Sequence, residues 1–123
     1  MASNAETLLA DTGRIKLHRD GKRVTVSFNG TEIANTTQAI TLREGSYPPA
    51  LYVPMADVVQ EHLIATSHSS HCPFKGQASY WSISANGETA ENAVWAYNAP
   101  RDDVALIKDH VAFYPDRVTI SVE

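Results

Sequence analysis

Tight-turn dipeptides divide this sequence into short segments in which apolar and polar residues alternate. Three of them occur, Asp20-Gly21, Asn29-Gly30 and Asn86-Gly87. Such pairs adopt the positive φ angles of two-residue hairpin turns, whose twist matches that of the flanking strands. The segments 14–18 and 23–28 flank the first turn, and each places its apolar residues on one face. The pattern predicts an antiparallel meander that begins with a hairpin at Asp20-Gly21.

The second half of the chain follows the same pattern. Residues 78–84 and 89–97 flank Asn86-Gly87, and we expect residues 112–114 and 118–122 to form a last hairpin around Pro115-Asp116. Helical spacing is limited to residues 55–63, which Pro54 would open, and to a single turn at 102–107. We therefore predict a mainly β, compact single domain of antiparallel hairpins with one or two short helices. Residues 1–13 are predicted as an N-terminal tail and residues 14–123 as the β-rich domain.

Composition excludes several classes of protein. A chain of 123 residues is the size of one domain, and its net charge of −4, without a basic run, argues against nucleic-acid or anionic-membrane binding. The single cysteine allows no internal disulfide, which is typical of a reducing compartment. No segment has the features of a signal peptide or of a membrane span. The expected location is the cytoplasm.

The segment 67–76 has the most unusual composition, because it carries a thiol, two imidazoles and an amine within a predicted loop. Cys72 becomes a nucleophile if a nearby cation, either Lys75 or a protonated His71, lowers its pKa. The alternative is a buried, inert cysteine in a rigid loop. His68, His71 and Cys72 lack the paired spacing of a zinc site, so we expect neither a metal nor a cofactor.

Glu44 lies at the end of a predicted strand, before the rigid Pro48-Pro49 turn. Its carboxylate is a candidate general base or ligand anchor, and the alternative is a surface charge paired with Arg43 or Lys75. The aromatic residues of the strands are core candidates first, but the polar tips of tyrosine and tryptophan also suit a ligand pocket. Phosphate-binding loops, dinucleotide fingerprints and the hydrolase elbow are absent.

These residues together resemble one family, called domain of unknown function 427 and sometimes labelled nucleotidyltransferase-like. The resemblance covers roughly residues 14–122, and its most specific part is Cys72–Gly76 with the Tyr80-Trp81 pair downstream. It implies a compact β-rich fold of a tent-like kind made from two small antiparallel sheets. It also implies that seven residues match motif positions of the family: Glu44, Tyr52, Cys72, Lys75, Tyr80, Trp95 and Tyr97. It supplies no activity, and the clustered carboxylates of metal-dependent nucleotidyl transfer are missing.

Three functional interpretations follow. In the first, the domain has a small-molecule pocket with catalytic candidates Cys72 (nucleophile or acid), Lys75 (charge stabiliser) and Glu44 (base). The ligand-binding candidates are Tyr52, Tyr80, Trp95, Tyr97 and His71. In the second, the pocket belongs to a non-catalytic module that binds a ligand or a partner protein. In the third, Lys75 and Glu44 form a buried ion pair that only fixes the loop. The expected partner is an unidentified small molecule, and an exposed edge strand also allows a homodimer.

Overall fold

The computed structural model describes residues 6–123, and strands dominate this part of the chain. The strands are β1 (Thr7–Asp11), β2 (Ile15–Arg19), β3 (Val24–Phe28), β4 (Thr31–Thr36), β5 (Ile40–Glu44), β6 (Ala50–Pro54), β7 (Leu63–Cys72), β8 (Gly76–Ala85), β9 (Glu88–Tyr97), β10 (His110–Phe113) and β11 (Thr119–Val122). Three short 3-10 turns complete the described elements: η1 (Met55–Asp57), η2 (Gln60–His62) and η3 (Asp102–Ile107). Within residues 6–123, no helix has the length and apolar character needed to cross a bilayer.

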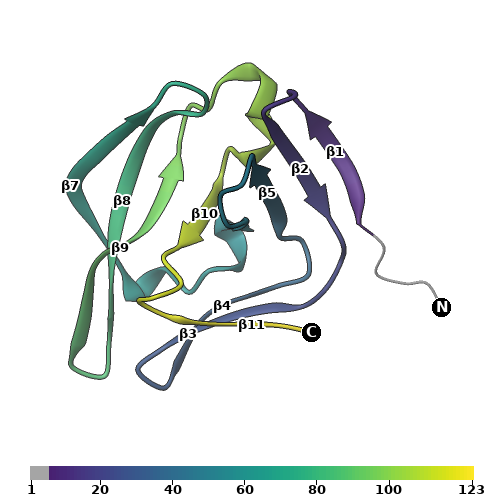
Figure 1. The fold of residues 1–123 in the computed structure, drawn as a ribbon. Coiled ribbons are helices and arrows are strands. Elements are labelled where there is room, and N and C mark those ends of the chain that lie inside the picture. Colours follow the sequence, from purple (N-terminus) through teal and green to yellow (C-terminus); the bar gives the residue numbers. More distant parts are fainter. Residues whose placement is uncertain (1–5) are drawn as a thin grey trace.

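The strands form two antiparallel sheets. The larger has eight strands in the order β1-β2-β5-β6-β10-β9-β8-β7, and the smaller has three in the order β11-β3-β4. In Figure 1, β7, β8 and β9 form one flank of the molecule, β1, β2 and β5 form the other, and the small sheet crosses the base. The predicted mainly β, antiparallel single domain is therefore confirmed.

Two of the three turn dipeptides close hairpins as predicted. Asn29-Gly30 joins β3 to β4, Asn86-Gly87 joins β8 to β9, and all four residues have positive φ, between 50° and 82°. The two hairpin tips also touch. The Asn29 side-chain amide donates to the carbonyl of Ala85 over 3.1 Å, and the Asn86 side-chain amide donates to the carbonyl of Asn29 over 2.9 Å. These contacts tie the small sheet to the large one.

The predicted hairpin at Asp20-Gly21 is wrong. Strand β2 pairs with β1 and β5, whereas β3 pairs with β4 and β11, so the turn connects the two sheets. The reason is that the two strands bury different cores. Ile15 and Leu17 of β2 belong to one hydrophobic cluster, and Val24 and Val26 of β3 belong to the other.

The predicted hairpin around Pro115-Asp116 is also wrong. Strand β10 lies between β6 and β9 in the large sheet, and β11 pairs with β3 in the small one. Val111, Ala112 and Phe113 of β10 are buried, as in the central strand of a sheet, whereas β11 is mostly exposed. The side chains of β10 are buried on both faces of the large sheet, with Val111 and Phe113 in one hydrophobic cluster and Ala112 in the other, which suits an inner strand and not a terminal hairpin.

Three other segments differ from the expectation. Residues 67–72 of the predicted loop belong to the edge strand β7, and only residues 73–75 form a turn. The predicted helix 55–63 is replaced by η1 and η2, because Val58 between them forms a β-bridge with Ala34 and the amide of Val59 donates to the carbonyl of Ile33. The turn predicted at 102–107 is η3.

The segment treated as a tail is strand from Thr7 to Asp11, since β1 pairs with β2 and Leu9 and Ala10 pack against a core cluster. Residues 1–5 of that predicted tail lie outside the described residues.

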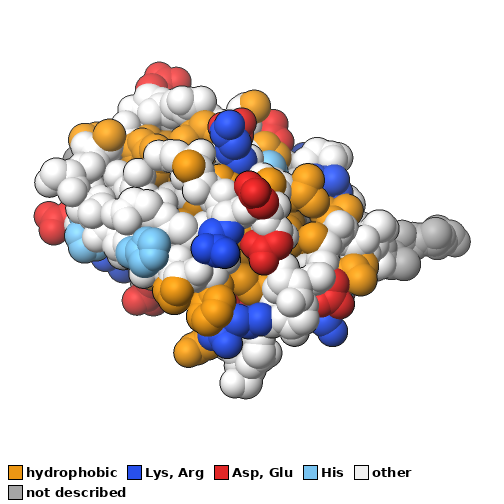
Figure 2. Space-filling view, turned by 90° about the horizontal axis from the view of Figure 1, so that it is seen from above, with side chains coloured by type: hydrophobic (Ala, Val, Ile, Leu, Met, Phe, Trp, Pro, Cys, Tyr) orange, Lys and Arg blue, Asp and Glu red, His pale blue; other side chains and the backbone are white. Residues whose placement is uncertain are grey.

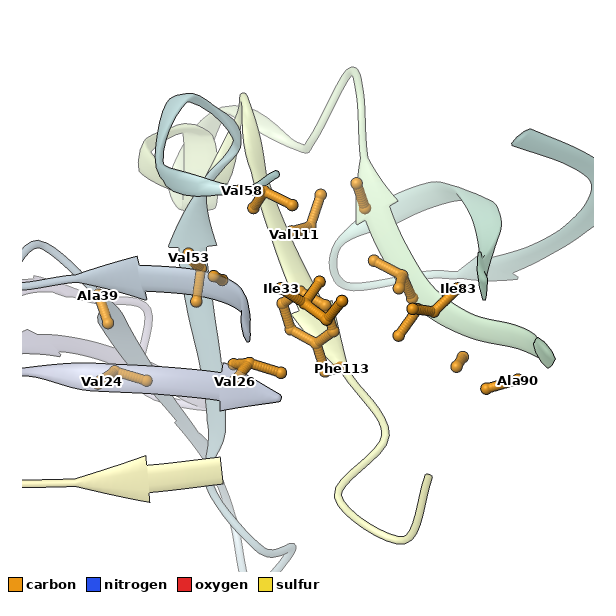
Figure 3. Packing of buried hydrophobic residues seen from close by; sticks show 14 residues of the cluster. Val24, Val26, Ile33, Ala39, Val53, Val58, Ile83, Ala90, Val111 and Phe113 are labelled. Carbon is orange, nitrogen blue, oxygen red and sulfur yellow. The ribbon is translucent and has the colours of Figure 1, made fainter. Parts of the chain in front are cut away.

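Two hydrophobic clusters hold the fold together. The first fills the space between the two sheets, where Ile33 and Phe113 meet Val26 and Ile83 (Figure 3). The second lies on the other face of the large sheet and contains Leu17, Tyr52 and Tyr80, with η3 closing over it through two buried side chains. The candidate functional residues lie at the edge of this second cluster.

Candidate functional site

A hollow of about 250 Å³ opens over the second cluster, between β5 and β6 on one side and β8 and β9 on the other. Its walls are largely aromatic, and its charged side chains are Glu44 and Lys75. The lining residues are Leu42, Glu44, Tyr47, Pro48, Ala50, Tyr52, Lys75, Tyr80, Trp95, Tyr97 and Tyr114. All five tyrosines of the chain are among them.

Strand pairing brings the aromatic residues together. Trp95 and Tyr97 occupy alternate positions of β9, and side chains at i and i+2 of a strand share a face. Tyr80 of β8 lies directly opposite Trp95 in the antiparallel register. Tyr52 comes from β6, where its ring meets Trp95 edge-on with the centroids 6.3 Å apart. Three strands, β6 and the β8–β9 hairpin, therefore supply one wall of aromatic rings.

Glu44 is the last residue of β5, and the following turn holds it in place. The amide of Tyr47 donates to the carbonyl of Glu44 over 3.0 Å, and Gly45 has a φ of +54°. The Glu44 side chain points inward and is 11% exposed. The same turn places Tyr47 and Pro48 at the rim of the hollow.

Both oxygens of the Glu44 carboxylate accept a charged hydrogen bond. Lys75 Nζ donates to Oε1 over 2.7 Å, and Arg14 Nε donates to Oε2 over 3.0 Å. Burial raises the pKa of Glu44, but the hydrogen bonds and positive charges of Lys75 and Arg14 outweigh that effect and leave the pKa below its ordinary value. Glu44 is therefore ionised at neutral pH, with one cation bound to each of its oxygens.

Lys75 is positioned by the turn between β7 and β8. Its amide donates to the carbonyl of Cys72, and its carbonyl accepts from the amide of Arg101 over 3.0 Å. Gly76 follows with a φ of +122°, and a Cβ there would lie 3.2 Å from the carbonyl oxygen of Ala99. A glycine is thus needed at this position for the turn to pack against residues 99–101.

Three phenol groups of the hollow, those of Tyr52, Tyr97 and Tyr114, stay protonated well above neutral pH. Burial raises the pKa of Tyr52 and of Tyr97 far above the ordinary value, and it raises the pKa of Tyr114 to about 12. Trp95 Nε1 donates to Tyr52 Oη over 3.2 Å, so the hydroxyl hydrogen of Tyr52 remains available to another acceptor. The hollow therefore presents hydrogen-bond donors.

Residues 16–123 match the sequence model of a family described as Domain of unknown function (DUF427). The chain belongs to this family. The resemblance stated from the sequence motifs is thus confirmed over most of the chain. No curated protein matches the DUF427 chain. Since the family description states no activity, the function of this DUF427 domain has to be argued from the geometry of the hollow.

Six of the residues selected from the DUF427 sequence converge on the hollow. They are Glu44, Tyr52, Lys75, Tyr80, Trp95 and Tyr97. Cys72 and His71 are not among the lining residues. Cys72 is half-buried at the end of β7 and packs against the second cluster, whereas His71 is exposed on that edge strand. His68, the other metal-ligand candidate considered, packs against the ring of Tyr80, and no group of three or more possible metal ligands occurs within residues 6–123.

Sequence reasoning did not find three contributors to the DUF427 site. Arg14, which precedes β2, holds the second oxygen of Glu44, and nothing in its local sequence indicates that contact. Tyr114 follows β10 and lies 4.5 Å from Trp95, centroid to centroid, whereas the sequence pattern predicts only a strand of the last hairpin at residues 112–114. Tyr47 lies three residues after Glu44. A turn at Gly45-Ser46 brings residues at this spacing close together, so the spacing itself indicates that Tyr47 lies near Glu44.

Proposed function

We propose that this DUF427 domain binds a small, planar, oxygen-bearing metabolite in the tyrosine hollow. The observation that carries the proposal is the convergence of all five tyrosines, with the Lys75 ammonium, on one cavity. A core needs apolar side chains and gains nothing from phenol groups gathered at one opening, because each buried hydroxyl requires a partner. Trp95 already donates to Tyr52 and Ser70 already bonds Tyr80, so a ligand that accepts hydrogen bonds would use the donor capacity that remains at this opening.

The donor set defines the chemistry of the ligand. Tyr52 and Tyr97 keep their hydroxyl hydrogens at physiological pH, and the Lys75 ammonium has three hydrogens, of which Glu44 accepts one. Carbonyl, carboxylate and hydroxyl oxygens are the matching acceptors. Next to the donors, Trp95 and Tyr114 pack on each other with ring centroids 4.5 Å apart, and a planar body would contact the aromatic surface that this pair contributes to the lining.

The volume sets the size of the ligand. A hollow of about 250 Å³ is near the lower end of ligand pockets, which measure roughly 300–1,000 Å³. A single-ring acid or a short keto or hydroxy acid fits this space, and a dinucleotide cofactor is too large. The proposed class is therefore a small carboxylic or carbonyl compound.

Binding explains this arrangement better than catalysis by the candidate residues. A general base needs a pKa near the working pH, whereas the cations on both oxygens of Glu44 stabilise its ionised form and lower its pKa. Cys72 lies outside the lining, which argues against its role as nucleophile on a molecule in the hollow. Turnover of a bound compound that stops in Lys75→Ala would favour the catalytic interpretation instead. We keep the cytoplasm as the proposed location, on the ground of the single cysteine.

The test is a thermal-shift screen of benzoates, phenylpyruvates and short keto and hydroxy acids, followed by titration of each hit with tryptophan fluorescence as the signal. A ligand at about 100 times its dissociation constant stabilises the domain by about 2.7 kcal/mol. Removing one hydroxyl by Tyr97→Phe should weaken a hit by roughly tenfold, since a hydrogen bond to a charged group contributes about 1.5 kcal/mol or more.

The two tryptophans provide a matched control. Trp95 lines the hollow, whereas Trp81 packs against the first cluster. Ligand-dependent quenching should disappear in Trp95→Phe and persist in Trp81→Phe. The proposal fails if no compound of these classes stabilises the domain, or if quenching survives in Trp95→Phe and is lost in Trp81→Phe.

A further inference from the structure

A second hollow, of about 620 Å³, lies over β2 and β5 and is distinct from the tyrosine hollow. Its lining contains three cations and two glycines, and no anion: Gly13, Arg14, Lys16, Arg43 and Gly45. The chain as a whole is acidic, with 14 acidic and 10 basic residues, whereas the side chains around this hollow are locally basic. Small residues at both ends leave open space, since a Cβ at Gly13 or Gly45 would meet no atom within 4 Å.

Two of these cations are opposed across the sheet. Lys16 of β2 is the direct partner of Arg43 in the antiparallel pairing of β2 with β5. Their strand neighbours Leu17 and Leu42 are buried, so Lys16 and Arg43 share the opposite, solvent-facing side. Like charges directly opposite in an antiparallel pair repel each other and destabilise the sheet. An anion between the two side chains would turn this repulsion into attraction.

Existing anions neutralise the cluster only in part. Arg14 gives its Nε to Glu44 and stacks on the Phe74 ring, with Cζ 3.9 Å from the ring centroid, but neither terminal nitrogen makes a hydrogen bond inside residues 6–123. Arg43 gives one terminal nitrogen to Glu6 over 2.7 Å. Each guanidinium group keeps N–H donors in the planar arrangement that suits oxyanions.

Lys16 has no ion-pair partner in the part of the chain that the structure describes. Asp11 of β1 lies opposite it in register, but the Asp11 carboxylate accepts the amide of Gly13 over 2.8 Å and is not within ion-pair distance of Lys16. The ammonium group of Lys16 is therefore available to a ligand.

We propose that Arg14, Lys16 and Arg43 bind a small oxyanion with two or more negative charges. The ligand is a phosphate group or a di- or tricarboxylate, both of which match guanidinium and ammonium donors. A small ion fits better than a nucleic acid, because the chain is acidic and the face seen from above in Figure 2 mixes lysine and arginine with aspartate and glutamate side chains. The site is independent of the tyrosine hollow and shares with it only the contact between Arg14 and Glu44.

The experiment titrates ¹⁵N-labelled protein with inorganic phosphate and, separately, with citrate, at constant ionic strength maintained with chloride. Saturable shifts should centre on the amides of residues 13–17 and 43–45. Stronger binding of phosphate identifies a phosphoryl ligand, and stronger binding of citrate identifies a carboxylate ligand. Lys16→Ala should weaken the preferred anion by about fivefold to tenfold, as expected for one lost charge-assisted hydrogen bond. Lys108→Ala, which removes an exposed cation outside the hollow, should leave the affinity unchanged.

The proposal is overturned if neither anion gives saturable shifts in the wild-type protein, or if the shifts centre elsewhere. It is also overturned if Lys16→Ala and Lys108→Ala weaken binding equally, which would indicate attraction by net charge. Arg43→Gln serves as a second test of the same site and should weaken binding as Lys16→Ala does. Tyr52→Phe should leave anion binding intact, which separates this site from the proposed function of the tyrosine hollow.

Discussion

Glu44→Gln should destabilise this domain more than Lys75→Met, and the reason lies in the unequal surroundings of the two partners. The side chains of Glu44 and Lys75 are 11% and 12% exposed, so both are nearly removed from water. When Lys75 is replaced, Glu44 keeps Arg14 as its partner. When Glu44 is replaced, the Lys75 ammonium is left without an anion, whereas Arg14 is 48% exposed and can be hydrated.

Breaking a buried ion pair from one side costs about 3–5 kcal/mol. We therefore expect Lys75→Met to lower the free energy of unfolding by about 3 kcal/mol, at the lower end of this range, and Glu44→Gln to lower it by about 5 kcal/mol, at the upper end. Since the free energy of unfolding of a domain of this size is about 5–15 kcal/mol, Glu44→Gln can bring the folded state close to the point where it is no longer stable. At roughly 4 °C per kcal/mol, the expected losses in Tm are about 12 °C and about 20 °C.

The assay is urea denaturation at pH 7, followed by tryptophan fluorescence and checked by thermal unfolding. The control is Glu6→Gln, which breaks an exposed ion pair with Arg43 and should cost less than about 1 kcal/mol. In the double variant Glu44→Gln with Lys75→Met, the loss should be smaller than the sum of the single losses. Two results would refute the reasoning: a larger loss in Lys75→Met than in Glu44→Gln, or losses no larger than in the control.

Three further predictions follow from the same structure. Because the pKa of Glu44 is lowered on folding, its contribution to stability is present above its unfolded pKa of 4.5 and is lost as the pH falls through its folded value. The free energy of unfolding, followed by circular dichroism at acid pH, should therefore depend less steeply on pH in Glu44→Gln than in the wild type. Because burial raises the pKa of Tyr52, stability is present below its unfolded pKa of 10.0 and is lost as the pH rises through the folded value, and an absorbance titration of the phenolate should lose a late-ionising group in Tyr52→Phe. Gly76→Ala should lower the unfolding free energy by about 2 kcal/mol, because φ is +122° there and the new Cβ would lie 3.2 Å from the Ala99 carbonyl oxygen. Gly21→Ala, at a φ of +73° in open space, should lower it by about 1 kcal/mol. Equal losses in the two variants would contradict the role of the Ala99 contact.

The fold class followed from local chemistry, because turn dipeptides and alternating residues act over a few positions. Asn29-Gly30 and Asn86-Gly87 needed no distant partner to specify their hairpins. Asp20-Gly21 carries the same turn chemistry, yet the chain passes there from one sheet to the other. The choice was made by burial of Ile15 and Val24 in different clusters, which depends on segments far along the chain.

The site was predictable to the extent that its residues lie in distinctive motifs. Glu44 and Lys75 stood out by their turns, and the structure joins them directly. Cys72 was selected for the reactivity of its thiol, but the residue type does not indicate whether the side chain points into the hollow. Arg14 was missed because its contact with Glu44 depends on the pairing of β2 with β5, which no local pattern of charge or hydrophobicity reveals.

The pairing of β3 with β11 has a consequence for synthesis on the ribosome. The hairpin of β3 and β4 leaves the exit tunnel early, but β11, which covers the other edge of β3, is translated after the whole large sheet. Until then the backbone groups on that edge of β3 are unpaired and can recruit another strand. We expect nascent chains halted before Thr119 to depend on chaperones, and released chains to become independent of them as soon as β11 has docked.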